Sequence, residues 1–222
     1  SFAKETGVKK MVHLSSVGVI GKQYSFDFIV VDEETKCSPM NYYEKTKLKS
    51  EEILLDFTSK NQIDLLVLRP TNVFGDGHPR KVLLHFISRI AEGKKVPYSK
   101  NALVNYVFVE DLVQIILAGL KTKLDHKIYL IGQPLTLSEF TNQISQMSSG
   151  KSRIIQLPNW IFIVFRLMGY LGSKRLKQKF HAISNKVSYD GSKIVQELGL
   201  NYNLTLGLRK TIAYYKQQGL KK

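Results

Sequence analysis

Short apolar runs that alternate with helical patterns are the feature that most limits how this chain can fold. The runs cover residues 9–15, 63–69 and 128–132, and each has the length of a buried strand. Residues 41–60 place apolar side chains at helical spacing, and an apolar helix is expected over 110–120. Strands that alternate with helices in this way favour an α/β fold with a parallel sheet.

The segments between these elements show weaker patterns. Residues 71–79 are expected to form a loop, and residues 81–91 a helix that Gly93 ends. Residues 104–109 are predicted to be extended, and a further helix is expected to begin near Thr136. From about residue 151 onward the sequence is basic and mostly helical in pattern, which separates it from the alternating part before it.

The composition is that of a globular protein with a strongly basic surface. The chain has 222 residues, of which 43% are hydrophobic, and a formal net charge of +15. The lysines are spread along the whole chain without a nucleic-acid-binding motif, so we expect no nucleic-acid partner. The single cysteine, Cys37, excludes an intramolecular disulfide and favours the cytoplasm. The histidines show no metal-ligand spacing, so no metal site is expected.

Tyr43 and Lys47 form the pattern with the most chemical content. Side chains four residues apart lie on one face of a helix. A free phenol ionises only near about pH 10, and a neighbouring ammonium group favours its ionised form, so such a pair can donate and accept a proton. Ser15 and Ser16 end the first apolar run and offer hydroxyl groups to a substrate oxygen. Tyr42 has no lysine at the required spacing.

Four stretches occur in the order, and in the strand or helix settings, that one enzyme family uses. They are VHLSSVGVIG at residues 12–21, NYYEKTKL at 41–48, LRPTNVFG at 68–75 and VFVEDL at 107–112. Together they resemble the extended short-chain dehydrogenase/reductase superfamily, the NAD-dependent epimerase/dehydratase family. The resemblance covers nearly the whole chain and is looser after residue 150.

The resemblance implies the C-terminal part of a Rossmann-like, doubly wound parallel sheet plus a smaller, mostly helical substrate-binding lobe. Residues 1–150 are expected to form a partial NAD(P)-binding domain with interleaved segments of the substrate lobe. Residues 151–222 are expected to form a mainly helical substrate-binding and C-terminal portion. The glycine-rich dinucleotide fingerprint is missing from the sequence, so we expect an N-terminally truncated fragment without the first βαβ units. Such a fragment is expected to bind cofactor weakly and to be inactive by itself.

The resemblance also implies roles for individual residues. Tyr43 is expected to act as acid and base at a substrate carbinol oxygen, with Lys47 and Ser16 assisting it. The cofactor is expected to be NAD or NADP. The residues expected to contact it are Ser15, Tyr43, Lys47, Pro70 and Val73, and those expected to contact substrate are Ser16, Asn72 and Arg80. Turn geometry alone would also explain the presence of Pro70, Asn72 and Val73, without any contact to cofactor or substrate.

Departures from the family pattern narrow the expected reaction. Val17 and Gly18 follow Ser16 where dehydratases of the family carry Asp-Glu, so a dehydratase is not expected. Gly18 also replaces a cysteine that some epimerases use. Of the reactions that the family carries out, hydride transfer at one carbinol of a nucleotide sugar is still expected. It would give either net oxidation or reduction, or epimerisation. Residues 104–106 lack the arginine common in sugar-nucleotide members, which leaves open a 3β-hydroxysteroid or lipid-alcohol dehydrogenase. A non-catalytic binding relative is a further alternative.

The apolar segment at residues 157–171, with the basic cluster that follows it to residue 179, has two interpretations. It is shorter than the roughly 20 residues of a membrane span, but an apolar helix with basic residues can lie at an anionic membrane surface. It can also pack over the substrate pocket or form a homodimer contact. We therefore expect a cytoplasmic protein that acts on a small molecule, with peripheral membrane contact through 157–179 and homodimer formation left open.

Overall fold

The computed structural model describes residues 2–21, 23–25, 27–77, 87–90, 93–99, 101–124, 127–148, 154–158, 160–162, 164 and 183–217. The strands are β1 (Lys10–Leu14), β2 (Ile29–Val31), β3 (Asp64–Pro70), β4 (Asn72–Phe74), β5 (Val96–Ser99), β6 (Leu103–Phe108), β7 (Ile128–Ile131), β8 (Gln133–Thr136), β9 (Ile154–Leu157) and β10 (Val187–Tyr189). The helices are α1 (Phe2–Glu5), the 3-10 helix η1 (Val17–Ile20), α2 (Tyr42–Asn61), α4 (Val109–Lys121), α5 (Leu137–Ser148), α8 (Ser192–Leu198) and α9 (Leu204–Gln217).

A parallel sheet with the strand order β1-β3-β7 forms the centre of the molecule. Leu14 at the end of β1 lies opposite Leu68, and Pro70 at the end of β3 lies opposite Ile131. The carboxyl ends of the three strands therefore meet at one edge of the sheet. This arrangement confirms the α/β fold with a parallel sheet.

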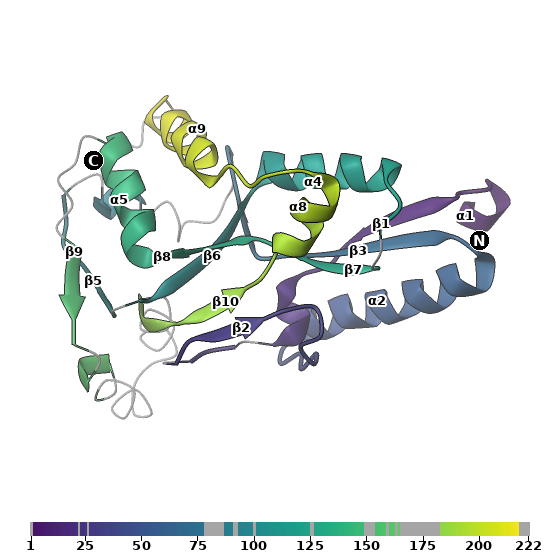
Figure 1. Cartoon of the computed structure of the whole chain (residues 1–222), viewed down its shortest axis with the longest axis horizontal. Helices are drawn as coiled ribbons and strands as arrows, with labels where there is room; N and C mark the ends of the chain where they lie inside the picture. Colours follow the sequence, from purple (N-terminus) through teal and green to yellow (C-terminus); the bar gives the residue numbers. More distant parts are fainter. Residues whose placement is uncertain are drawn as a thin grey trace.

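Helices cover both faces of this sheet, as parallel sheets require. α2 lies on one face, and α4 with α8 lies on the other (Figure 1). Leu66 and Leu68 of β3 pack into a buried cluster with residues of α4 and α8. Side chains alternate along a strand, so Arg69 lies on the opposite face, toward α2, where it contacts Glu51.

Short strands build the remaining sheets from distant parts of the chain. β4 pairs in parallel with β6, and β6 pairs antiparallel with β8. The expectation of a plain loop over residues 71–79 was therefore wrong for residues 72–74, because a three-residue strand has too little periodicity to show in the sequence. β10 pairs with β2 and β9 with β5, so the part after residue 150 contributes strands as well as helices. Of the helix expected over 81–91, only residues 87–90 are described, and they are helical.

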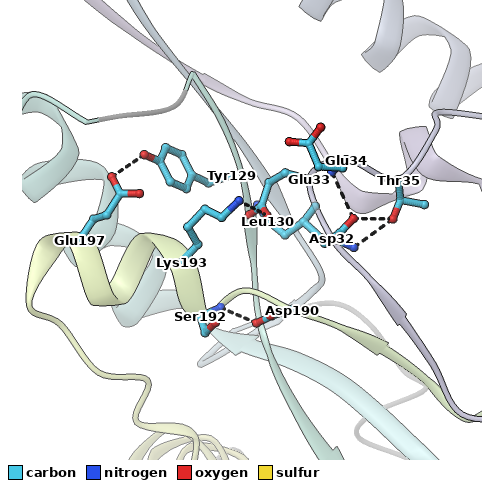
Figure 2. Close-up of polar contacts among 10 residues, drawn as sticks. All are labelled: Asp32, Glu33, Glu34, Thr35, Tyr129, Leu130, Asp190, Ser192, Lys193 and Glu197. Atoms are coloured by element: carbon cyan, nitrogen blue, oxygen red, sulfur yellow. Dashed lines mark hydrogen bonds and ion pairs between the residues drawn. The ribbon is translucent and has the colours of Figure 1, made fainter.

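The outer edge of β7 is closed by a carboxylate instead of by another strand. Glu33, in the turn after β2, accepts a hydrogen bond from the Leu130 backbone N–H at 3.0 Å. Its other oxygen lies 3.2 Å from the Lys193 ammonium of α8, and Glu197 of the same helix accepts from the Tyr129 hydroxyl at 2.6 Å (Figure 2). Polar side chains thus tie α8 and the turn after β2 to the end of the sheet.

Candidate active site

The residues predicted for the site lie around the carboxyl ends of β1 and β3. In open α/β sheets, ligands bind in the crevice outside the carboxyl ends of the strands. Ser15 directly follows β1, and its backbone N–H donates to the Leu68 carbonyl of β3 at 2.8 Å. Thr71 directly follows β3, and its N–H donates to the Ile131 carbonyl of β7 at 2.8 Å. These bonds fix the start of both loops.

The two serines after β1 occupy different environments. Ser16 caps η1 and accepts a hydrogen bond from the Gly18 N–H at 3.1 Å, while its side chain remains half-buried. Ser15 is buried, and its hydroxyl oxygen has no hydrogen-bond partner among the described residues. Ser16 therefore holds the turn in shape, whereas Ser15 has hydrogen-bonding capacity to spare.

A capping box fixes where α2 begins and hence where its first turn lies. The Asn41 side chain accepts from the Glu44 N–H at 3.0 Å, and the Glu44 carboxylate accepts from the backbone N–H groups of Met40 and Asn41. Glu44 is buried by this arrangement. Asn41 and Glu44 are the residue types that N-caps favour, so the predicted helix start at Asn41 is confirmed.

α2 carries Tyr43 and Lys47 one turn apart on the same face. Lys47 is half-buried, and its ammonium donates to the Leu14 carbonyl at the end of β1 at 2.8 Å. Tyr43 is 56% exposed, which leaves its phenol open to a ligand. The fold therefore brings Lys47 to the strand end that leads into Ser15 and Ser16.

The site residues predicted at the end of β3 and after it differ in their burial and in their hydrogen bonds to other parts of the fold. Pro70 ends β3 and is buried, and Val73 is half-buried against the core beside β6. The Asn72 amide donates to the Asn105 carbonyl at 3.1 Å and so joins β4 to β6. Arg80 lies outside the described residues.

Three charged or titratable residues near Tyr43 and Lys47 were given no role from the sequence. Glu51 lies one turn beyond Lys47 on α2 and pairs with Arg69 of β3. His13 of β1 is neighboured by Lys47 and Glu51, and burial, followed by the positive charge of Lys47, lowers its pKa. The spacing of Glu51 from Lys47 is visible in the sequence, but its burial against Arg69 is not.

The residues present fit the nicotinamide end of an NAD(P) cofactor. A ligand with hydrogen-bonding groups suits the unpartnered Ser15 hydroxyl at the carboxyl end of the sheet. Lys47 reaches the end of β1 next to Ser15, Tyr43 lies one turn away on the same face of α2, and Pro70 with Val73 lines the neighbouring strand end. Among the described residues, no group of three or more His, Cys, Asp or Glu side chains is placed to hold a metal ion.

None of the described helices is both long enough and apolar enough to cross a membrane. Most of the segment 157–179 lies outside the described residues.

Three curated proteins illustrate what the sequence is similar to. The dTDP-D-glucose 4,6-dehydratase of Homo sapiens is 22% identical over 223 residues, which cover 98% of this chain and 59% of that protein. An N-acetyl-alpha-D-glucosaminyl-diphospho-ditrans,octacis-undecaprenol 4-epimerase of Escherichia coli O157:H7 is 26% identical over 230 residues, with 95% and 66% covered. A sterol-4-alpha-carboxylate 3-dehydrogenase of Mus musculus is 29% identical over 112 residues, with 50% and 31% covered.

Solved structures share the fold. The UDP-glucuronic acid 4-epimerase from Bacillus cereus, crystallised in complex with NAD, superposes with a TM-score of 0.67 at 18% identity, over 97% of this chain and 64% of that one. The chain thus spans about two thirds or less of the length of these relatives.

A family model agrees with the fold. The model of the NAD dependent epimerase/dehydratase family matches residues 1–132, which is more than half of the 222 residues. The matched range contains α2, β3 and β4, the described elements that carry Tyr43, Lys47, Pro70, Asn72 and Val73, and it contains Ser15 and Ser16 after β1. The chain belongs to the NAD dependent epimerase/dehydratase family.

Proposed function

We propose that the full-length protein is an NAD(P)-dependent epimerase or dehydrogenase that acts by hydride transfer at a carbinol of a nucleotide sugar. Tyr43 serves as the acid and base, Lys47 as the positive charge beside it, and Ser16 as the group that holds the substrate oxygen. The observation that carries the proposal is the hydrogen bond from the Lys47 ammonium to the Leu14 carbonyl, which sets the Tyr43 face of α2 at the end of β1.

The proposed chemistry divides between cofactor and protein. The bound nicotinamide supplies the hydride acceptor or donor. Tyr43 takes the proton from the carbinol oxygen during oxidation and returns it during reduction. Lys47 places a positive charge one helical turn from the phenol, and Ser16 orients the oxygen by a hydrogen bond. Ser15 has a buried hydroxyl, without a hydrogen-bond partner in the described part of the chain, with which to hold the cofactor side of the site.

The turn after β1 argues against an elimination reaction. Val17 and Gly18 begin η1 and carry no carboxylate. The nearest carboxylate is that of Glu44, whose Cγ lies 3.1 Å from the point where a Cβ on Gly18 would stand. Glu44 is committed to the N-terminal cap of α2, where it accepts from Met40 and Asn41. We therefore assign hydride chemistry without dehydration to this chain.

Nucleotide sugars are the substrate class that the relatives favour, since a dehydratase and an epimerase of such compounds match most of the chain. A sterol or lipid alcohol is the second candidate, because a sterol dehydrogenase matches half of the chain. Residues 104–106 also contain no arginine. The Asn105 side chain is instead hydrogen-bonded to the backbone of Val187 and Tyr189 in β10. A homodimer and a peripheral membrane contact through 157–179 stay predictions of the sequence.

Replacement of Tyr43 by phenylalanine in the full-length protein tests the mechanism. Loss of the proton-transferring hydroxyl is expected to lower kcat by about 10²–10⁴-fold. Tyr42→Phe is the matched control, because Tyr42 is the neighbouring tyrosine and is 84% exposed, so its activity is expected to match the parent protein. Turnover is followed by nicotinamide absorbance, with product analysis for epimerisation, on a panel of nucleotide sugars and sterols.

The outcomes of this experiment separate the alternatives. Equal activity of the Tyr43→Phe and Tyr42→Phe proteins would remove the proposed mechanism. Turnover of sterols alone would select the second substrate class. Tight binding of panel compounds without turnover, even with cofactor bound, would identify a non-catalytic relative.

A further inference from the structure

A buried ion pair clamps the helix that carries the proposed acid and base. The Arg69 guanidinium of β3 donates to both carboxylate oxygens of Glu51 on α2, with Nε–Oε1 at 3.1 Å and Nη2–Oε2 at 2.7 Å. The Arg69 side chain is 5% exposed and that of Glu51 is 2% exposed. Two parallel bonds between planar groups hold one geometry, and both groups are too deeply buried for water to replace either partner.

The ion pair lies on the same face of α2 as the proposed catalytic residues. Tyr43, Lys47 and Glu51 follow one another at intervals of four residues. The bond between Glu51 and Arg69 therefore fixes how α2 is rotated about its axis relative to β3. It also fixes the position of α2 along that axis. Burial makes Glu51 and Arg69 depend on each other: Glu51 raises the pKa of Arg69, although burial alone acts in the opposite direction.

Arg69 also contacts the segment that leads into α2. Its Nη2 lies 3.4 Å from the Cys37 sulfur, and burial, as the leading cause, raises the pKa of that thiol, which favours the protonated form. The next residue, Ser38, donates its N–H to the Val19 carbonyl of η1 at 3.0 Å. Ser16 caps the same η1, so the contact of Arg69 with Cys37 reaches the turn that carries the proposed substrate-binding hydroxyl.

Arg69 is itself the residue before Pro70, where the strand gives way to the loop expected to contact the nicotinamide. Arg69 thus belongs to the end of β3, pairs with the first half of α2, and contacts Cys37, whose neighbour Ser38 is bonded to the turn after β1. We infer that Glu51 and Arg69 are positioning residues, which set the register of Tyr43 and Lys47 against Ser16 and Pro70. This inference rests on the proposed function, because it assigns the pair a role in that reaction.

The competing explanation is that the pair serves stability alone. Apolar side chains of similar volume can replace a buried ion pair with little or no loss of stability, but they do not fix one register by directed bonds. A double replacement, Glu51→Leu with Arg69→Met, therefore separates the two roles. Arg69→Lys is the second variant, since lysine keeps the charge and loses the planar fork. Asp56→Asn is the control, because Asp56 forms an exposed pair with Lys60 on the same helix.

The variants are made in the full-length protein and assayed where thermal melting shows each to be folded. For positioning residues, we expect kcat to fall by about tenfold to a hundredfold in both Arg69→Lys and the double variant, since small misplacements of reacting groups have effects of this size. KM for the substrate changes little, and the pH–rate profile departs from that of the parent protein because Tyr43 and Lys47 are no longer held in register. The Asp56→Asn protein keeps the parent kcat and pH profile.

A double variant with parent-like melting, kcat and pH profile would overturn the inference, because apolar packing would then serve as well as the ion pair. If the double variant does not fold, Arg69→Lys decides alone: parent kcat and pH profile in the folded protein overturn the inference. Failure of the proposed function is recognised separately, since Tyr43→Phe would then retain activity.

Discussion

Two buried carboxylates hold segments against the central sheet, and their partners differ in exposure. Glu51 pairs with Arg69, whose side chain is only 5% exposed, on the face covered by α2. Glu33 closes the outer edge of β7 and pairs with Lys193, whose side chain is 38% exposed (Figure 2). When a buried charge loses its buried partner, no water is present to solvate it. When an exposed lysine is lost, water can take its place beside the carboxylate. The difference indicates that the pair next to the proposed site is far less tolerant of change than the edge contact.

Removal of the charge at Glu51 is expected to have the largest effect. Glu51→Gln leaves the Arg69 guanidinium buried without a counter-charge, so we expect a loss of about 3–5 kcal/mol in the free energy of unfolding. Denaturant unfolding measures this loss. The exposed pair of Asp56 and Lys60 is the control on the same helix, and Asp56→Asn is expected to cost only about 0.3–0.5 kcal/mol. Equal losses in the two variants would contradict the comparison.

Changes at Glu33 are expected to have an intermediate effect. Glu33→Ala leaves the Leu130 N–H at the edge of β7 without its acceptor, with an expected loss of about 1–3 kcal/mol. Glu33→Gln keeps an amide oxygen for that bond and is expected to lose less. Lys193→Ala removes only the part-exposed partner and is expected to cost about 0–1 kcal/mol. The same unfolding measurements check this order, and a larger loss in Lys193→Ala than in Glu33→Ala would break it.

The pH dependence of stability sharpens the comparison on the α2 side. Burial and the charge of Lys47 lower the pKa of His13 in the folded protein below its ordinary value of 6.5. The unfolded chain then binds a proton more readily than the folded one, so stability falls as the pH drops below about 6.5. The slope from one such group cannot exceed about 1.4 kcal/mol per pH unit. A His13→Gln protein is expected to lose this part of the slope between pH 7 and 5, and an unchanged slope would contradict the assignment.

Local patterns in the sequence predicted the elements that carry the site. The helical spacing of apolar residues over 41–60 marked α2, and the apolar runs marked β1, β3 and β7. Side-chain spacing on a helix is fixed by its geometry, so the shared face of Tyr43 and Lys47 followed from their positions alone. The family resemblance was confirmed by the match over residues 1–132.

Pairings between distant segments were not predictable in the same way. β4 has three residues and is defined by its partner β6, more than thirty positions farther along the chain. β9 and β10 likewise exist through β5 and β2, although the sequence around them is basic and mostly helical in pattern. Nothing in the sequence predicted a contact between Cys37 and Arg69, which the structure brings within 3.4 Å of each other.

The sequence by itself determined the α/β alternation, the helix caps and the face of α2 that carries Tyr43 and Lys47, because these depend on residues a few positions apart. Only the tertiary structure decided that Lys47 meets the Leu14 carbonyl, that the Ser15 hydroxyl is buried with no hydrogen-bond partner among the residues described, and that Glu51 and Arg69 form a water-excluded pair. These properties depend on which atoms of distant segments are brought together and on how much solvent their packing removes.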